Sequence, residues 1–374
     1  MRKYRSHTNE VTMGVLSIFF VCLGLLLIYS TSSVFSMQQY GSQYHFFYRQ
    51  FLYACFGLAL MAILGFSDYR RFQPYAAPVL VLSGLLLLLV FLPGLGKEVR
   101  GAQRWIDLGP VNFQPSELVK VTMVFYLASL LSRKAVQKSI RDSFPSYLTI
   151  WLITLPFLGL VLAQKDLGTP VIMVMTVFLL LFLAGARGQH LALTALAVIP
   201  AAGLLCLGNH RWQRLTSFWD PWADPYGAGY QLIQSLISLG KGGLFGVGLG
   251  NGTQKLFYLP DAHTDFIFSV MGEELGMVGC YVFLFLLLLF VVTGVRVALR
   301  APDAFGVFLA CGLTFLVGLQ MAVNVGISLG LLPTKGMALP FLSYGGSSLL
   351  TTLMAVGLLI SIARHGVMRS RPRT

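Results

Sequence analysis

The run VFLFLLLLFVV, residues 282–292, decides the fold class, because it is apolar at every position. A strand of an outer-membrane barrel alternates apolar and polar residues, whereas a helix surrounded by lipid is apolar on all sides. The run VLVLSGLLLLLVFL, residues 79–92, has nearly the same character. Both runs therefore predict membrane-spanning helices.

The composition extends this prediction to the whole chain. Of its 374 residues, 56% are hydrophobic and only 11% are charged, and the mean hydropathy is +0.74. An ordinary soluble enzyme has roughly a quarter of its residues charged. Because one crossing takes about 20 apolar residues, the apolar residues suffice for about ten crossings. We predict an all-α polytopic membrane protein, a single integral membrane domain over residues 1–374 with ten transmembrane helices. The predicted spans are 11–35, 46–66, 75–93, 116–132, 147–163, 168–186, 190–208, 266–295, 304–330 and 347–363.

The lysines and arginines indicate which side of the membrane each loop faces. A net charge of +13 in a soluble protein would suggest nucleic acid binding. With the N-terminus in the cytoplasm, however, most of these cations fall in the loops on that side, as membrane topology requires. We therefore predict that both termini are cytoplasmic, that residues 364–374 form a basic cytoplasmic tail, and that nucleic acid is not a partner.

This topology places three longer segments, 94–115, 209–264 and 331–346, on the extracytoplasmic face. The largest, 209–264, connects the seventh and eighth helices, and a loop of this length usually has a function. Its stretch 227–237 predicts an amphipathic helix that lies on the membrane. The glycine-dense stretch 240–252 follows, and it lacks the spacing of a Walker phosphate loop.

Ionisable residues inside or beside the spans are candidate functional residues, because charges are costly in a bilayer. Glu117 and Lys120 share one face of the fourth helix, so they either form a structural ion pair or hold Lys120 near a diphosphate. Asp166 either caps the sixth helix or lines an active cavity. Glu273 and Glu274 point about 100° apart on a helix, so we expect one to bond locally and the other to face a polar interior.

Asp265 stands where the large loop meets the eighth helix. If Pro260 is a first-turn residue, Asp261 and Asp265 share one helix face, and their repulsion would raise one pKa toward that of a general base. The alternative is that these acids only complement the helix dipole. His263 is either a second titrating group or a simple hydrogen-bonding residue.

Cations on the same predicted face complete a candidate active site. A carboxylate able to take a proton, near cations able to hold an anion, suits displacement of a diphosphate by a hydroxyl group. A site for a neutral solute would not need these cations. They are Arg104, Arg211, Arg214, Lys241, Lys255 and Lys335.

Five motifs make the chain recognisable. In chain order they are GAQRWIDLG (101–109), FQPSELVK (113–120), DPYGAGYQLIQS (224–235), GGLFGVGLGNGTQKLFYLPDAHTDFIFSVMGEELG (242–276) and LLPTKGMALPFLSYGGSSLL (331–350). Together they resemble the SEDS family, named for shape, elongation, division and sporulation. The match spans most of the chain in the right order.

The resemblance implies a peptidoglycan glycosyltransferase with ten transmembrane helices that polymerises lipid II at the outer face of the bacterial cytoplasmic membrane. It also implies a class B penicillin-binding transpeptidase and other divisome proteins as partners, and lipid II and undecaprenyl chains as lipid ligands. The family's essential aspartate of the HTDFIF motif corresponds to Asp265, its glutamate–lysine pair to Glu117 and Lys120, and its TKG lysine to Lys335.

The TKG loop resembles the cell-division branch more than the elongation branch, which usually lacks this lysine. Division is therefore the expected role, an elongation polymerase is the second choice, and spore-cortex paralogues stay open. Three positions depart from the family pattern: Asp261 replaces a glutamate, Phe257 stands where division members often have an acid, and Lys165 stands where proline is common.

The resulting hypothesis makes Asp265 the general base. It would deprotonate the 4-hydroxyl of an N-acetylglucosamine, which attacks the anomeric carbon of N-acetylmuramic acid and inverts the α-diphosphate to a β-1,4 bond. Undecaprenyl diphosphate would leave, and a divalent cation such as Mg²⁺ or Mn²⁺ is left open as an additional stabiliser. The residues predicted to bind substrate are Arg104, Arg211, Arg214, Lys335, Lys120, Glu117, Asp166 and His263.

Two other classes of function compete with this hypothesis. A lipid II flippase would also need many helices with internal charges, but a coupled transporter would be expected to show repeat halves with helices broken at the midplane. No such repeat is evident, and the candidate charges cluster at one face. The third class is a scaffold that docks a transpeptidase.

Overall fold

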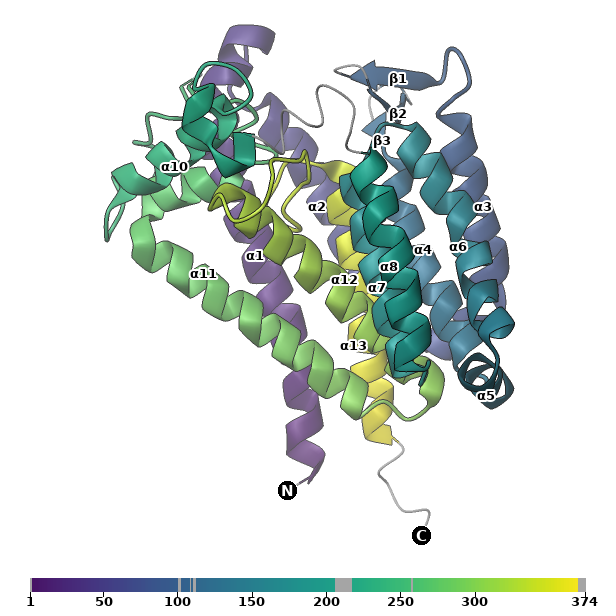
Figure 1. The fold of residues 1–374 in the computed structure, drawn as a ribbon. Coiled ribbons are helices and arrows are strands. Elements are labelled where there is room, and N and C mark those ends of the chain that lie inside the picture. Colours follow the sequence, from purple (N-terminus) through teal and green to yellow (C-terminus); the bar gives the residue numbers. More distant parts are fainter. Residues whose placement is uncertain are drawn as a thin grey trace.

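The computed structural model describes residues 2–99, 102–107, 109, 112–205, 217–256 and 258–368. Long helices run between two ends of the molecule, and both termini lie at the same end (Figure 1). The helices are α1 Arg2–Tyr40, α2 His45–Phe66, η1 Tyr69–Tyr75, α3 Ala76–Leu89, α4 Pro115–Leu131, α5 Lys134–Asp142, α6 Phe144–Ala163, α7 Gly168–Leu183, α8 Gly188–Leu205, η2 Pro221–Ala223, α10 Tyr230–Gly242, α11 Ile267–Leu299, α12 Ala304–Ser328 and α13 Gly346–Met368.

The described helices overlap all ten predicted spans, although residues 206–208 of the seventh span, 190–208, lie outside the described residues. Seven of them are long and apolar enough to cross a membrane, and α7 and part of α8 are shorter apolar helices. The span predicted at 116–132 is α4, which carries two charged side chains. The chain is therefore a polytopic membrane protein, and the count of ten crossings stays a prediction.

The C-terminal helix α13 is the centre of the bundle. In its most apolar window 83% of the residues are buried, compared with 22% for α11. It packs on α1, α2, α4, α11 and α12. Small residues allow the closest of these contacts, because a Cβ at Gly357 would lie 2.8 Å from the carbonyl oxygen of Met61 on α2.

The segment 94–115 corrects the all-α prediction. It contains three short antiparallel strands in the order β1-β2-β3, which are β1 Gly96–Val99, β2 Ala102–Asp107 and β3 Asn112–Phe113. Lys97 and Asp107 close β1 onto β2 through an ion pair of 3.1 Å, and the hydrogen bond from Lys97 lowers the pKa of Asp107. The sheet lies at the end of the bundle away from the termini, as does α10 (Figure 1).

The predicted loop 209–264 contains a helix in its described part. This helix is α10, Tyr230–Gly242, which begins three residues later and ends five residues later than the predicted helix 227–237. One face of α10 packs on the start of α11, where Ser235 and Ser269 share a hydrogen bond of 2.6 Å. Ser235 also donates to the carbonyl of Ser328 on α12. The helix is therefore fixed to the bundle through its hydroxyl-bearing face.

Candidate active site

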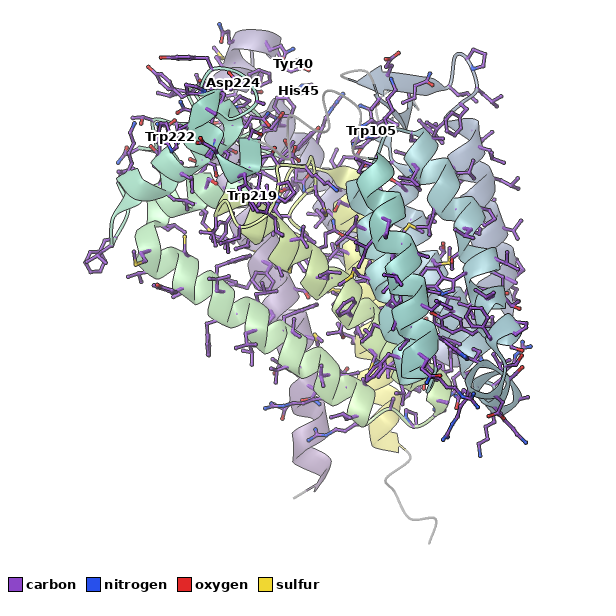
Figure 2. All side chains as sticks on the ribbon, viewed as in Figure 1. Tyr40, His45, Trp105, Trp219, Trp222 and Asp224 are labelled. Carbon is purple, nitrogen blue, oxygen red and sulfur yellow. The ribbon has the colours of Figure 1, made fainter. Side chains whose placement is uncertain are left out.

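A cavity of about 410 Å³ opens at the end of the bundle that carries the sheet. Trp105, one of its lining residues, is labelled at this end in Figure 2, and so are Tyr40 and His45, whose rings stack on each other. Five separate segments supply the lining: β2, the residue before α4, α10, the turn before α11, and the loop before α13 together with the first turn of α13. The lining residues are Ala102, Arg104, Trp105, Gln114, Gln231, Asp261, Thr264, Asp265, Phe266, Thr334, Lys335, Gly336, Ala338, Tyr344, Gly345 and Ser348.

Asp265 is held by a turn that begins at Asp261. Asp261 has a left-handed backbone, φ +58°, and its carbonyl accepts the backbone N–H groups of Thr264, Asp265 and Phe266. The amide of Asn324 on α12 donates to the carbonyls of Asp265, at 2.9 Å, and Met337, at 2.6 Å. The backbone of the predicted base is thus fixed on two sides.

This turn corrects the expectation that Asp261 and Asp265 share a helix face. The helix begins at Ile267, beyond both acids, and Pro260 is not a first-turn residue. The two carboxylates nevertheless line the same cavity.

The loop that carries Lys335 docks on the turn that carries Asp265. The Ser343 hydroxyl donates to the carbonyl of Thr264, and the backbone N–H of Tyr344 donates to the carbonyl of His263 at 2.9 Å. A Cβ on Gly336 would lie 3.1 Å from Oδ2 of Asp265. The Asp265 carboxylate therefore packs against Gly336, which directly follows Lys335 in the sequence.

Tyr344 adds a hydroxyl group to the cavity. Burial raises the pKa of this phenol above its ordinary value of 10.0, although Arg49 beside it acts in the opposite direction. The phenol is therefore protonated at neutral pH and can donate a hydrogen bond.

Arg104 lines the cavity from β2. Its guanidinium donates to two backbone carbonyls of the turn between α6 and α7, from Nε to Gln164 at 3.3 Å and from Nη2 to Lys165 at 2.6 Å. Lys165 itself has a left-handed backbone, φ +60°. These two bonds orient the guanidinium at the wall of the cavity.

Asp166 is 4% exposed and accepts from the backbone N–H groups of Gly168 and Thr169 and from the Thr169 hydroxyl at 2.8 Å. These are the contacts of a cap on the first turn of α7. Asp166 does not contribute to the cavity lining.

Glu117 and Lys120 also lie outside the lining. Both are buried, and Lys120 Nζ lies 2.9 Å from Glu117 Oε1 and 2.8 Å from Gln320 Oε1. Gln320 in turn donates to the carbonyl of Ala338, which belongs to the loop carrying Lys335. The ion pair is therefore connected to that loop through Gln320. The suggested contact between Lys120 and a diphosphate stays a prediction.

His263 lies in an aromatic cluster beside the cavity. Its ring centroid is 5.8 Å from that of Phe35, 5.2 Å from that of Phe46 and 6.0 Å from that of Tyr344. His263 therefore packs against Tyr344, which lines the cavity, but is not itself a lining residue. The two remaining predicted ligands, Arg211 and Arg214, lie outside the described residues.

Several lining residues were not predicted, namely Trp105, Gln114, Gln231, Thr334 and Tyr344. The sequence reasoning selected residues whose charge is costly in a bilayer, and these residues are neutral. Only the fold brings them together. Within the described part of the chain, no three His, Cys, Asp or Glu side chains gather as a metal site. A second cavity of about 820 Å³ at the other end, lined by residues such as Arg70 and Asp303, contains none of the predicted site residues.

Comparisons with known proteins agree with this architecture. The family model FTSW_RODA_SPOVE, described as a cell cycle protein, matches residues 11–367. A probable peptidoglycan glycosyltransferase FtsW from Geobacter sp. (strain M18) is 43% identical over 364 residues, covering 97% of this chain and 98% of the relative. Stage V sporulation protein E from Bacillus subtilis (strain 168) is 38% identical, covering 95% and 97%.

Solved structures share the fold. A chain of a peptidoglycan synthase complex that coordinates polymerization and crosslinking has a TM-score of 0.77 at 33% identity, covering 95% of this chain and 97% of that one. The rod shape determining protein RodA from Thermus thermophilus has a TM-score of 0.69 at 32% identity, covering 94% and 95%. Because the family model and these relatives match almost the whole chain, the protein belongs to the FtsW/RodA/SpoVE family of cell cycle proteins, the SEDS family.

Proposed function

We propose that the chain is a peptidoglycan glycosyltransferase of cell division that polymerises lipid II into β-1,4-linked glycan and releases undecaprenyl diphosphate. One observation carries the proposal: the carboxylate of Asp265 and the cations Arg104 and Lys335, which the sequence places far apart, line a single cavity. The family membership and the names of the FtsW relatives support the same reaction.

The cavity supplies the two functions that the reaction needs. Asp265 takes the proton of the 4-hydroxyl of an acceptor N-acetylglucosamine, and that oxygen forms the new bond to the anomeric carbon of N-acetylmuramic acid. The bond from that carbon to the diphosphate oxygen breaks, and the leaving anion is stabilised by Arg104 and Lys335. The ester is already activated, so no nucleotide is consumed.

A divalent cation would fit this site as a ligand shared between protein and substrate. Magnesium is commonly held by one or two carboxylates together with substrate phosphates. The carboxylates that line the cavity, and that would hold the cation, are Asp261 and Asp265. When bound, such a cation would neutralise charge on the diphosphate.

We also propose an arrangement of the chain in the membrane. Ten helices cross the bacterial cytoplasmic membrane, the termini are cytoplasmic, and the cavity faces the extracytoplasmic side, where residues 209–264 form the large loop between the seventh and eighth helices. The bias of Lys and Arg toward the termini end supports this orientation. Similarity to a chain of a peptidoglycan synthase complex supports a partnership with a class B penicillin-binding transpeptidase.

The test is polymerisation of fluorescent lipid II by purified protein with its transpeptidase partner. Asp265→Asn should lower the rate at least about 100-fold, the low end of the loss expected for a general base. Asp261→Asn is the matched control, because it removes a carboxylate from the same cavity and asparagine tolerates a left-handed backbone. It should lose less activity than Asp265→Asn, because a carboxylate that only helps to hold a cation does not take the proton.

Other outcomes assign other functions. A wild-type rate in Asp265→Asn would remove this residue from the mechanism. Lipid scrambling in liposomes without polymer would indicate a flippase, and neither activity would indicate a scaffold.

A further inference from the structure

The helix α11, which begins two residues after Asp265, is broken at Gly276. The backbone there has φ +69° and ψ −170°, which separates a short helix, Ile267–Leu275, from the long span that follows. A helix break leaves N–H and C=O groups without partners, and these must be satisfied when they are buried.

The glycine loop 243–248 fills this break, and we call it the clasp. Its carbonyls at Gly243 and Leu244 accept the N–H groups of Met277 and Val278, at 2.9 and 3.1 Å. Its N–H groups at Val247 and Gly248 donate to the carbonyls of the two glutamates that end the short helix, at 3.0 and 3.1 Å. The clasp thus replaces the hydrogen bonds that a continuous helix would make.

Lys255 and Glu274 form a buried ion pair beside the clasp, and we call this pair the latch. The ammonium of Lys255 lies 2.6 Å from Glu274 Oε1, and the two side chains are only 6% and 0% exposed. Lys255 also donates to the hydroxyl of Ser30, at 2.8 Å, and to the carbonyl of Gly250, at 2.7 Å. All three N–H bonds of the ammonium are therefore used.

The latch joins three parts of the chain. Ser30 belongs to α1 and lies 2.7 and 2.9 Å from the two carboxylate oxygens of Glu274. Glu273 beside it accepts from the backbone N–H groups of Thr253 and Gln254, at 2.8 Å for Thr253. Both adjacent acids thus bind the loop that leads to Asp265, where one had been expected to face a polar interior.

A buried ion pair is a weak source of stability. Taking two charges out of water costs about as much as their attraction returns, and apolar replacements are often neutral or stabilising. A pair this completely hydrogen-bonded therefore calls for a role other than stability, and fixing one geometry is the best attested.

We propose that Lys255 and Glu274 are positioning residues for the polymerisation reaction, which fix the short helix Ile267–Leu275 and so the place of Asp265 in the cavity. The inference rests on the proposed function of Asp265. Asp265 is attached directly to this short helix, whose first turn packs through Phe266 and Val270 against Ile327 of α12. Movement at the latch end of so short a helix is carried to its other end.

The test is the double variant Lys255→Met/Glu274→Gln, which removes both charges and leaves neither partner alone. Its matched control is Arg70→Met/Asp303→Asn, which removes an ion pair of 2.7 Å at the termini end. Four quantities are measured on each purified protein with its transpeptidase: the melting temperature, kcat for lipid II, KM for lipid II, and amide hydrogen exchange at residues 247, 248, 277 and 278.

The latch variant should keep its melting temperature and its KM, lose at least about ten-fold in kcat, and exchange faster at those four amides. The control should keep kcat. A wild-type kcat in the latch variant, with Asp265→Asn inactive, would overturn the inference alone. A loss of activity that only follows the unfolded fraction would also overturn it, and an active Asp265→Asn would refute the proposed function together with the inference.

Discussion

Replacing Gly276 by alanine should destabilise the whole region around the clasp. The backbone at this position lies in a region that only glycine readily adopts, so an L residue costs about 1–3 kcal/mol in strain. The new Cβ would lie 2.3 Å from the backbone nitrogen of Gly246 and 2.6 Å from the carbonyl oxygen of Leu244. Overpacking of this kind costs about 1–3 kcal/mol more. The sum, about 2–6 kcal/mol, is a large part of the roughly 5–15 kcal/mol of a typical domain.

Two other glycines separate strain from lack of space. Gly243 has φ +54° but no atom within 4 Å of a built Cβ, so Gly243→Ala should cost only the strain, about 1–3 kcal/mol. Gly240 lies inside α10 with open space and no positive φ, so Gly240→Ala should be neutral or stabilising by up to about 1 kcal/mol.

Thermal unfolding of the purified protein in detergent, followed by tryptophan fluorescence, measures this series. The melting temperature should fall in the order Gly240→Ala, Gly243→Ala, Gly276→Ala. If Gly276→Ala melts as high as Gly243→Ala, the close contacts between the clasp and α11 contribute nothing, and the reasoning is refuted.

Three further predictions concern the cavity and the termini end. Gly336→Ala would bring a methyl group 3.1 Å from Oδ2 of Asp265, so kcat for lipid II should fall about ten-fold at an unchanged melting temperature; an unchanged kcat would show that the carboxylate moves aside freely. Arg104→Lys loses the fork that binds two carbonyls, so its polymerisation rate should lie nearer to that of Arg104→Ala than to wild type, and full activity would contradict this. Burial raises the pKa of Asp303, but hydrogen bonds from Gly306, Tyr69 and Arg70 outweigh it and hold that pKa below its ordinary 3.8. The contribution of Asp303 to the free energy of unfolding is therefore fully present above pH 3.8 and is lost as the pH falls through the lower pKa of the folded state. Asp303→Asn should remove this part of the acid dependence of the melting temperature. An identical pH profile in the variant and the wild type would rule out this contribution.

Hydropathy and charge predict the helical segments and the main site residues. The cost of charge near a bilayer was enough to single out Asp265, Arg104 and Lys335, which share one cavity. The same reasoning selected Glu117 and Lys120, because a buried pair that supports a loop and a pair that binds substrate look alike in a sequence.

The missed features depend on the backbone. The strands of segment 94–115 are short and polar, so no alternation of apolar residues marks them. A glycine within an apolar helix is often tolerated, and nothing in the residues around Gly276 distinguishes a break from a tolerated glycine. The expectation that Asp261 and Asp265 share a helix face was wrong, because the backbone at Asp261 is left-handed and the chain turns there.

The central place of α13 has a consequence for biosynthesis. A ribosome makes this helix after the other helices of the bundle, yet it is the one on which α1, α2, α4, α11 and α12 pack. The earlier helices therefore lack their shared packing partner in the lipid until α13 has been made. A chain that stops before residue 346 would lack the axis of its bundle, and membrane proteases could recognise it as incomplete before it ever reached a partner.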